Sequence, residues 1–155
     1  APSLVFTCEE AWKARDNKSS IHLEDFLEVS ERFKNLNINK KWNIVKNIRK
    51  VITGAIEKKR AEKIIGSSLE SHISIYVSDK IKEDIKNINF EEVAIISSFE
   101  LLEYEKENTY FSIQEINDIA VGVKKTKGNK CERCWKYTEK LSSSNICSRC
   151  EEAIK

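Results

Sequence analysis

The chain has 155 residues, of which 40% are hydrophobic and 34% charged, and its formal net charge is +2. This balance is typical of a globular chain with one or two small domains. It argues against a membrane-spanning helix, because no apolar run approaches the roughly 20 residues that such a helix needs. The amino terminus lacks the pattern of a signal peptide, and since the chain contains no Met we expect it to be a fragment of a longer protein.

The small net charge conceals an uneven distribution. Residues 40–68 carry 9 basic and 2 acidic groups, and residues 124–155 carry 9 and 4, whereas residues 69–123 carry 4 and 12. Separated basic blocks favour two contact points on a polyanion. Lysine-rich helices can also be merely well solvated, and charge alone leaves both interpretations open.

Two helices are predicted in the first part of the chain. Residues 7–15 favour a short helix capped by Thr7, with Glu10 as its capping-box partner, and a polar connection leads into a short extended piece. From residue 39 to residue 65 a long helix is predicted, which Gly66 is expected to end. Its apolar residues recur at spacings of three and four: Trp42, Val45, Ile48, Ile52, Ala55 and Ile56.

The hydrophobic period then changes. Residues 72–77 alternate between apolar and polar side chains, which predicts a strand, and residues 78–90 return to helical spacing with Ser78 or Asp79 as cap. Two further stretches are interpreted as strands, residues 92–99 and residues 118–126, with Gly122 as a bulge or a close approach. The sequence therefore predicts an α+β fold: a helical segment (1–68), a small mixed α/β unit (69–123) and a C-terminal cysteine segment (124–155).

Four of the five cysteines lie near the C-terminus as C-x2-C-x12-C-x2-C. A two-residue gap lets both thiolates of a pair reach one metal ion across a tight turn, and two such turns complete a four-sulfur site. Zinc, one ion per chain, is the expected metal in a closed, structural site, with Cys131, Cys134, Cys147 and Cys150 as ligands. Two disulfides or a rubredoxin-like iron site are the alternatives; disulfides need an oxidising compartment that nothing in the sequence signals.

Cys8 lies far from this motif and is interpreted as a small packed hydrophobe. Trp135 follows the first cysteine pair directly. Its ring can shield the metal, or it can stack on an unpaired base while Arg133 and Lys136 hold phosphates. One ring can serve in both roles.

These residues together carry a family resemblance. The segment "KGNKCERCWKY" with "ICSRC" closely resembles the C-terminal zinc knuckle of bacterial-type isoleucyl-tRNA synthetases. The segment "RAEKIIGSSLESHISIYV" is similar to their join between anticodon-binding helices and a small α/β junction domain, and "IHLEDF" and "APSLVFTCEEAW" are similar to their anticodon-domain stretches. A related knuckle ends some DNA glycosylases, which lack the "GSSLE" segment and the helices before it.

The resemblance implies that residues 1–68 end an anticodon-binding domain, that residues 69–123 form the junction domain and that residues 124–155 form the zinc knuckle. The family joins isoleucine to its tRNA using ATP, through an aminoacyl-adenylate. Its HIGH- and KMSKS-type motifs do not occur here, so ATP and magnesium are expected only in an absent catalytic domain and this fragment is expected to be non-catalytic. His22 and His72 are interpreted as structural, because the sequence places no Cys, Ser or carboxylate constellation around them.

The implied partners are isoleucine-accepting tRNA and the rest of the parent synthetase; the chain is expected to be cytoplasmic and monomeric, without membrane contact. The candidate RNA-binding residues are Lys124, Lys125, Lys127, Lys130, Arg133, Trp135, Lys136 and Arg149. A second group, expected along one face of the long helix, is Arg49, Lys50, Lys58, Lys59 and Arg60. Two rival hypotheses remain: a free-standing zinc-knuckle adaptor that binds protein or nucleic acid, and a purely structural cap of the parent enzyme.

Overall fold

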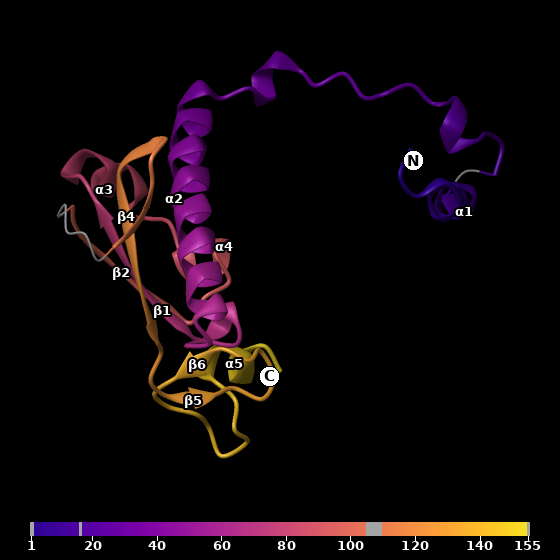
Figure 1. Ribbon diagram of the computed structural model, residues 1–155. Helices are drawn as coiled ribbons and strands as arrows, with labels where there is room; N and C mark the ends of the chain where they lie inside the picture. Colours follow the sequence, from indigo (N-terminus) through magenta and orange to yellow (C-terminus); the bar gives the residue numbers. More distant parts are fainter. Residues whose placement is uncertain (1, 16, 105–109, 155) are drawn as a thin grey trace. The chain divides into compact units, whose positions relative to one another are not determined.

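A computed structural model describes residues 2–15, 17–104 and 110–154 (Figure 1). The chain forms two compact units, residues 1–35 and residues 36–155. Among the described residues, buried hydrophobic side chains occur only in the second unit. None of the described helices is both long enough and apolar enough to cross a membrane.

The first unit consists of one helix and two short 3-10 turns. These are α1 (Val5–Arg15), η1 (Ile21–Leu23) and η2 (Glu31–Phe33). The predicted helix at residues 7–15 is confirmed, but the Thr7 cap is wrong, because the helix begins two residues earlier and encloses Thr7. Within the unit, the Glu9 carboxylate accepts a hydrogen bond from the Ser20 hydroxyl at 2.8 Å, which ties the helix to the turn that follows it.

The long helix of the second unit is α2, Leu36–Ala61, which confirms the helix predicted from residue 39. Its apolar side chains form a stripe that is buried in the core: Val45, Ile48, Val51, Ile52, Ala55 and Ile56. Trp42, predicted to belong to this stripe, is 43% exposed, because the first turns of the helix extend beyond that core.

The end of α2 differs from the prediction. Lys63, and not Gly66, adopts the left-handed backbone conformation that stops the helix, with φ of 58°. The backbone N–H of Lys63 donates to Arg60 O and that of Ile64 donates to Lys59 O, both at 3.0 Å. These two hydrogen bonds satisfy carbonyls of the last turn, as in other helices that end in a left-handed residue.

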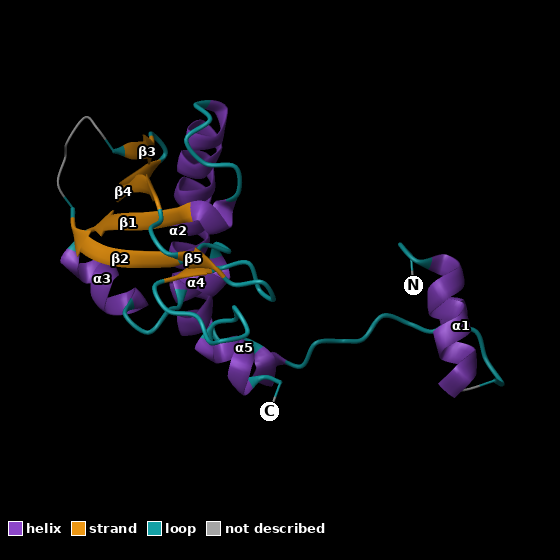
Figure 2. Ribbon diagram, turned by 90° about the horizontal axis from the view of Figure 1, so that it is seen from below, coloured by secondary structure: helices purple, strands orange, loops and turns teal. Residues whose placement is uncertain are grey.

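A four-stranded sheet packs against α2 (Figures 1 and 2). Its strands are β1 (Ser71–Val77), β2 (Ser98–Glu103), β3 (Phe111–Ile113) and β4 (Ile116–Lys125). Their order is β2-β1-β4-β3, with β1 parallel to β2 and antiparallel to β4. Ile73, Ile75 and Val77 of β1 are fully buried, which confirms the predicted alternation. The intervening residues, among them His72, lie on the opposite face of the sheet.

The connection from β1 to β2 holds two short helices, α3 (Asp79–Ile85) and α4 (Phe90–Val93). The helix predicted at residues 78–90 is confirmed in α3, but the strand predicted at residues 92–99 is wrong over most of its length, since β2 begins only at Ser98. The Asn89 side chain caps α4 by accepting from Glu91 N at 3.0 Å. A short apolar run is compatible with a buried strand or with a buried turn of helix. Here the Asn89 cap favours the helix.

Strand β4 confirms the prediction at residues 118–126, and of the two alternatives predicted for Gly122, a bulge or a close approach, the bulge is not found. The pairing of β1 with β4 continues without a shift through Ser74 and Gly122. A Cβ atom at Gly122 would lie 3.6 Å from side-chain atoms of Ser74, Tyr76 and Tyr110, which is ordinary van der Waals contact. An alanine side chain would therefore also fit at position 122.

The chain ends in a small segment, residues 126–154, that we call the hook. It contains β5 (Asn129–Lys130), β6 (Tyr137–Thr138) and α5 (Ser148–Glu152), and it lies at the end of the sheet where β4 finishes (Figure 1). The hook has its own core of Cys131, Ile146 and Cys150. The α+β architecture is thus confirmed. The domain boundaries at residues 68 and 123 stay a prediction, and α2 shares one core with the sheet.

Candidate metal centre and nucleic-acid interface

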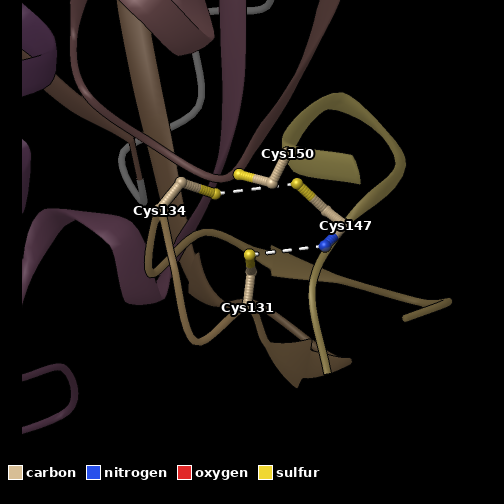
Figure 3. A group of neighbouring side chains, drawn as sticks. All are labelled: Cys131, Cys134, Cys147 and Cys150. Carbon is tan, nitrogen blue, oxygen red and sulfur yellow. Dashed lines mark hydrogen bonds between the residues drawn. The ribbon is translucent and has the colours of Figure 1, made fainter. Parts of the chain in front are cut away.

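The four cysteines of the hook converge on one point (Figure 3). Their sulfur atoms all lie within 4.8 Å of one another, and those of Cys134 and Cys147 are 3.7 Å apart. The first pair, Cys131 and Cys134, sits in the turn between β5 and β6, and the second pair comes from the start of α5, for which Cys147 is the N-cap residue. The sequence motif is thereby brought into a single cluster.

The backbone holds each pair in a tight turn. In the first turn, Trp135 N donates to Cys131 O at 2.9 Å, and Trp135 takes a left-handed conformation with φ of 65°. The two turns are joined by Glu132 N, which donates to Asn145 O at 3.1 Å, and by Cys147 N, which donates to the Cys131 sulfur at 3.3 Å. The sulfur positions are therefore set by local hydrogen bonds of the hook.

The surroundings of the sulfurs differ in polarity. Burial opposes ionisation of Cys131, but N–H groups of Cys134, Cys147 and Arg133 outweigh it and lower the pKa of the Cys131 thiol to about 6. Burial raises the pKa of the Cys134 thiol to about 12. The Arg133 guanidinium lies 3.7 Å from the Cys150 sulfur. The Cys131 thiol is thus favoured as a thiolate, whereas the Cys134 thiol is held in its neutral form by burial.

The cluster fits a tetrahedral metal with four thiolate ligands. Zn–S bonds of about 2.3 Å place two sulfurs of a tetrahedron about 3.8 Å apart, close to the 3.7 Å between Cys134 and Cys147. The structure forms no disulfide among the five cysteines, all of which it describes, and the 3.7 Å between the Cys134 and Cys147 sulfurs exceeds the about 2.05 Å of such a bond. Four protein ligands leave no open coordination position, and such a site stabilises a fold without performing catalysis.

Most candidate RNA-binding residues of the hook region are exposed. The exposed set is Lys124, Lys125, Lys127, Lys130, Arg133, Trp135 and Arg149. Trp135 is 60% exposed, and the Lys130 ammonium group lies 5.3 Å from the centre of its ring. A largely exposed ring with a cation beside it is a surface on which an unpaired base can stack.

Three of the candidate RNA-binding cations, one of them outside the exposed set, form ion pairs with acidic side chains. The Lys136 ammonium, whose side chain is 19% exposed, lies 2.9 Å from the Glu91 carboxylate. Arg149 lies 3.4 Å from Glu92, and Lys125 lies 3.5 Å from Glu70. Glu91 and Glu92 both belong to α4. Two of the hook's own predicted RNA-binding residues, Lys136 and Arg149, therefore help to attach it to α4.

The second group of candidates does not lie along one face of α2, so that prediction is wrong. Successive helix residues are rotated by about 100°, so Arg49 and Arg60 project in nearly the same direction, whereas Lys59 lies in the direction of the buried Ile52. Arg60 pairs with Glu57 at 2.8 Å, and Lys59 pairs with Glu62 at 2.7 Å. Lys50 lies 4.0 Å from Glu115.

The tertiary structure joins the two basic blocks of the sequence. Lys58 and Lys59 of α2 line a cavity of about 300 Å³ together with Lys124 of β4, and Tyr110 and Phe111 contribute aromatic rings to it. The cations of residues 40–68 and 124–155 thus meet at Lys124. Sequence reasoning missed this, because it requires the packing of β4 on α2.

The surroundings of the two histidines also differ from the prediction. The His72 ring lies 2.8 Å from the Ser98 hydroxyl and 3.4 Å from the Glu100 carboxylate. His22 lies 4.0 Å from Glu9. Ser98 is the register partner of His72 in the parallel pair β1–β2. The His72 contacts are therefore those of neighbours on one sheet face, and they give no reason to assign a nucleophile.

Residues 1–77 match the family described as the anticodon-binding domain of tRNA ligase. Residues 128–153 match the zinc finger found in FPG and IleRS. The two matches occur in the order that the resemblance implied. They cover α1, α2, β1 and nearly the whole hook.

Curated relatives extend this likeness over almost the whole chain. The isoleucine–tRNA ligase of Bartonella henselae is 36% identical over 145 residues, which cover 92% of this chain and 15% of the relative. That of Brucella abortus is 37% identical over 140 residues, or 89% of this chain and 14% of the relative. That of Natranaerobius thermophilus is 34% identical over 164 residues, or 99% of this chain and 18% of the relative. The chain thus spans less than a fifth of each of these relatives, and it belongs to the isoleucine–tRNA ligase family.

Proposed function

We propose that this chain is the tRNA-binding, anticodon-side region of an isoleucine–tRNA ligase and that it takes no part in bond making. The observation that carries the proposal is the pair of family matches in one chain, an anticodon-binding domain at residues 1–77 and a zinc finger at residues 128–153. ATP, magnesium and the joining of isoleucine to tRNA belong, on this proposal, to a catalytic part that these residues do not contain. The working location is the cytoplasm, and the chain acts as a monomer.

The hook holds one structural zinc ion on this proposal, through Cys131, Cys134, Cys147 and Cys150. The support is the donor set itself, four sulfurs that lie within 4.8 Å of one another. Cys131 and Cys150 are fully buried, and the Arg133 guanidinium lies near the Cys150 sulfur. Zinc suits four thiolates and brings no redox chemistry. Its role is to serve as the core of a segment too small to bury much apolar surface.

RNA contact is assigned to the exposed cations and to Trp135. Lys124, Lys127 and Lys130 are exposed, and no ion pair within 4.0 Å involves them among the described residues. They are available to phosphates at little cost. Lys125 and Arg149 must first exchange an acidic partner, which reduces the net gain. The same holds for the α2 cations that have a partner, namely Lys50, Lys59 and Arg60 with acidic side chains and Arg49 with the Val93 carbonyl. Lys136 is the least exposed of the set.

The test uses the zinc-loaded chain and the parent enzyme side by side. The chain should bind an isoleucine-accepting tRNA more tightly than a DNA duplex of equal charge, and it should show no isoleucine-dependent exchange of pyrophosphate into ATP. The parent lacking residues 124–155 should keep that exchange and lose charging of tRNA. If the truncated parent charges tRNA at the full rate, or if the chain prefers duplex DNA, the proposal is wrong and the structural-cap or adaptor hypothesis replaces it.

A further inference from the structure

We infer that a cavity between the end of the sheet and the β5–β6 hairpin binds one unpaired nucleotide of the tRNA, with its phosphate on lysines and its base inside the cavity. The inference rests on the proposed function and locates a contact that the family matches do not assign. The cavity has a volume of about 440 Å³. Its lining comes from the starts of β1 and β2, the end of β4 and β6: His72, Ser98, Lys124, Lys125, Lys127 and Tyr137.

The walls of the cavity are fixed by hydrogen bonds between separate elements. Thr126 N donates to Glu70 O at 2.7 Å. This hydrogen bond holds the loop that follows β4 against the segment that precedes β1. On the opposite wall, Tyr137 N donates to the Ser97 hydroxyl at 2.8 Å, and Ser97 in turn donates to Leu69 O. A cavity that exists before the ligand arrives binds with less loss of conformational entropy than one that must be formed.

The charge of the lining selects an anion. Lys124, Lys125 and Lys127 face one carboxylate, Glu139, at this cavity. By contrast, a second cavity, which shares Glu139 with the first, balances Lys130 and Lys140 against Glu132 and Glu139. Three ammonium groups within four residues of chain, only one of them paired within 4.0 Å among the described residues, match a phosphodiester.

The size and the remaining lining groups match a base. A volume of about 440 Å³ lies at the lower end of the ~300–1,000 Å³ that small-molecule sites occupy. It admits one nucleotide and excludes a duplex. Tyr137 and His72 offer rings, and the hydroxyl groups of Ser98, Thr126 and Thr138 can exchange hydrogen bonds with a base edge. An unpaired nucleotide supplies both the phosphate and the open base edge that this lining fits.

The cavity also continues into the other candidate surfaces. Lys130 of β5 is the register partner of Tyr137, so the cavity and the Lys130–Trp135 surface share one hairpin. Lys124 lines this cavity and the neighbouring one that contains Lys58 and Lys59. A nucleotide seated here therefore has cations on both sides for the phosphates of its neighbours along the strand.

The experiment compares Lys127→Ala with Lys140→Ala in the zinc-loaded 155-residue chain. Both are exposed lysines of the hook region, but only Lys127 lines the cavity. The affinity for an isoleucine-accepting tRNA transcript is measured across a salt series, with zinc content and thermal unfolding checked for each variant. Lys127→Ala should weaken binding about five- to tenfold at low salt and lower the salt slope by about one phosphate contact. Lys140→Ala should change the affinity less than twofold.

A second measurement tests for an unpaired base. A tRNA anticodon stem-loop that carries 4-thiouridine is irradiated with the wild-type chain, and the crosslinked peptides are identified. The inference expects crosslinks to the segment around Tyr137, and none when the same label lies in a fully paired RNA hairpin stem. Tyr137→Leu, which keeps the backbone donor to Ser97, should reduce the crosslink while zinc is retained.

The outcomes separate this inference from the proposed function. If wild-type chain does not bind tRNA, both are wrong. If tRNA binds but Lys127→Ala and Lys140→Ala behave alike, the proposed function stands and the cavity is not the contact. If crosslinks to the Tyr137 segment arise equally from paired RNA, the cavity does not select an unpaired nucleotide and the inference is overturned.

Discussion

Lys136 was expected to meet a phosphate, and its geometry leads to a different prediction: it positions the hook. Its ammonium group lies 2.9 Å from Glu91 of α4, and the two side chains are 19% and 34% exposed. The perturbations that test this are Glu91→Gln, Lys136→Met and the double variant. Each replacement keeps most of the side-chain volume, so the comparison reports the ion pair and not the packing around it.

The expected magnitude follows from this burial. Fully exposed ion pairs contribute about 0.2–1 kcal/mol, whereas removing one partner of a fully buried pair costs about 3–5 kcal/mol. A pair with one side chain mostly covered lies near the top of the first range. We therefore expect a coupling of about 1 kcal/mol between Glu91 and Lys136, which corresponds to roughly a fivefold change in an equilibrium constant.

The assay has two readouts on the zinc-loaded chain. Denaturant unfolding of the wild type and the three variants gives the coupling free energy from the double-mutant cycle. Binding of tRNA across a salt series gives the salt slope. A residue that neutralises a phosphate lowers that slope by about one when it is removed. Lys136→Met should leave the slope unchanged, as Glu91→Gln should, because neither side chain meets a phosphate on this reasoning.

A coupling below about 0.3 kcal/mol, together with a salt slope that falls by one unit in Lys136→Met alone, would contradict the positioning role of Lys136. Lys136 would then contact RNA as the sequence suggested, and the ion pair with Glu91 would be replaceable. Lys130→Ala provides the matched comparison. Lys130 is exposed and lies beside Trp135, so its removal should lower the slope by about one.

Three further predictions concern the hook and the sheet. Cys147→Ser should reduce the zinc content from one ion per chain to none and unfold the hook, while the core formed by α2 and the sheet persists. Elemental analysis measures the zinc and amide NMR spectra report the fold, and loss of the sheet signals would contradict the prediction. Gly128→Ala should lower the free energy of unfolding by about 1–3 kcal/mol, because Gly128 has φ of 122° and a Cβ atom there would lie 2.7 Å from Thr138 O; the control Gly122→Ala, with its nearest contacts at 3.6 Å, should change the stability far less. Burial, followed by the hydrogen bond with Tyr110, raises the pKa of Tyr76 from 10.0 to about 12. The stability that this pKa difference contributes is therefore complete below pH 10 and is lost as the pH rises towards about 12. The difference in tyrosinate absorbance between the wild type and Tyr76→Phe should titrate at about 12, and a midpoint near 10 would contradict the burial argument.

The sequence was sufficient for features that depend on local spacing. The cysteine motif predicted one four-sulfur cluster, because a two-residue gap fixes the geometry of a pair whatever surrounds it. The period of α2 and the alternation of β1 were read correctly for the same reason: each follows from the backbone geometry of a single element. The family resemblance likewise rests on short contiguous segments.

The tertiary structure decided what depends on contacts between distant residues. The apolar run at residues 92–99 turns through α4 before it enters β2, because Asn89 caps a helix and leaves only the end of the run to pair with β1. The sequence also could not predict which cations remain available to bind phosphates, because Lys136 contacts Glu91 only in the folded chain, where the hook packs on α4. The meeting of Lys58 with Lys124 requires β4 to pack on α2. Charge and spacing along the chain specify which groups are present, but the free energy of a cation depends on the acids and the solvent that the fold places around it, and these come from residues far away in the sequence.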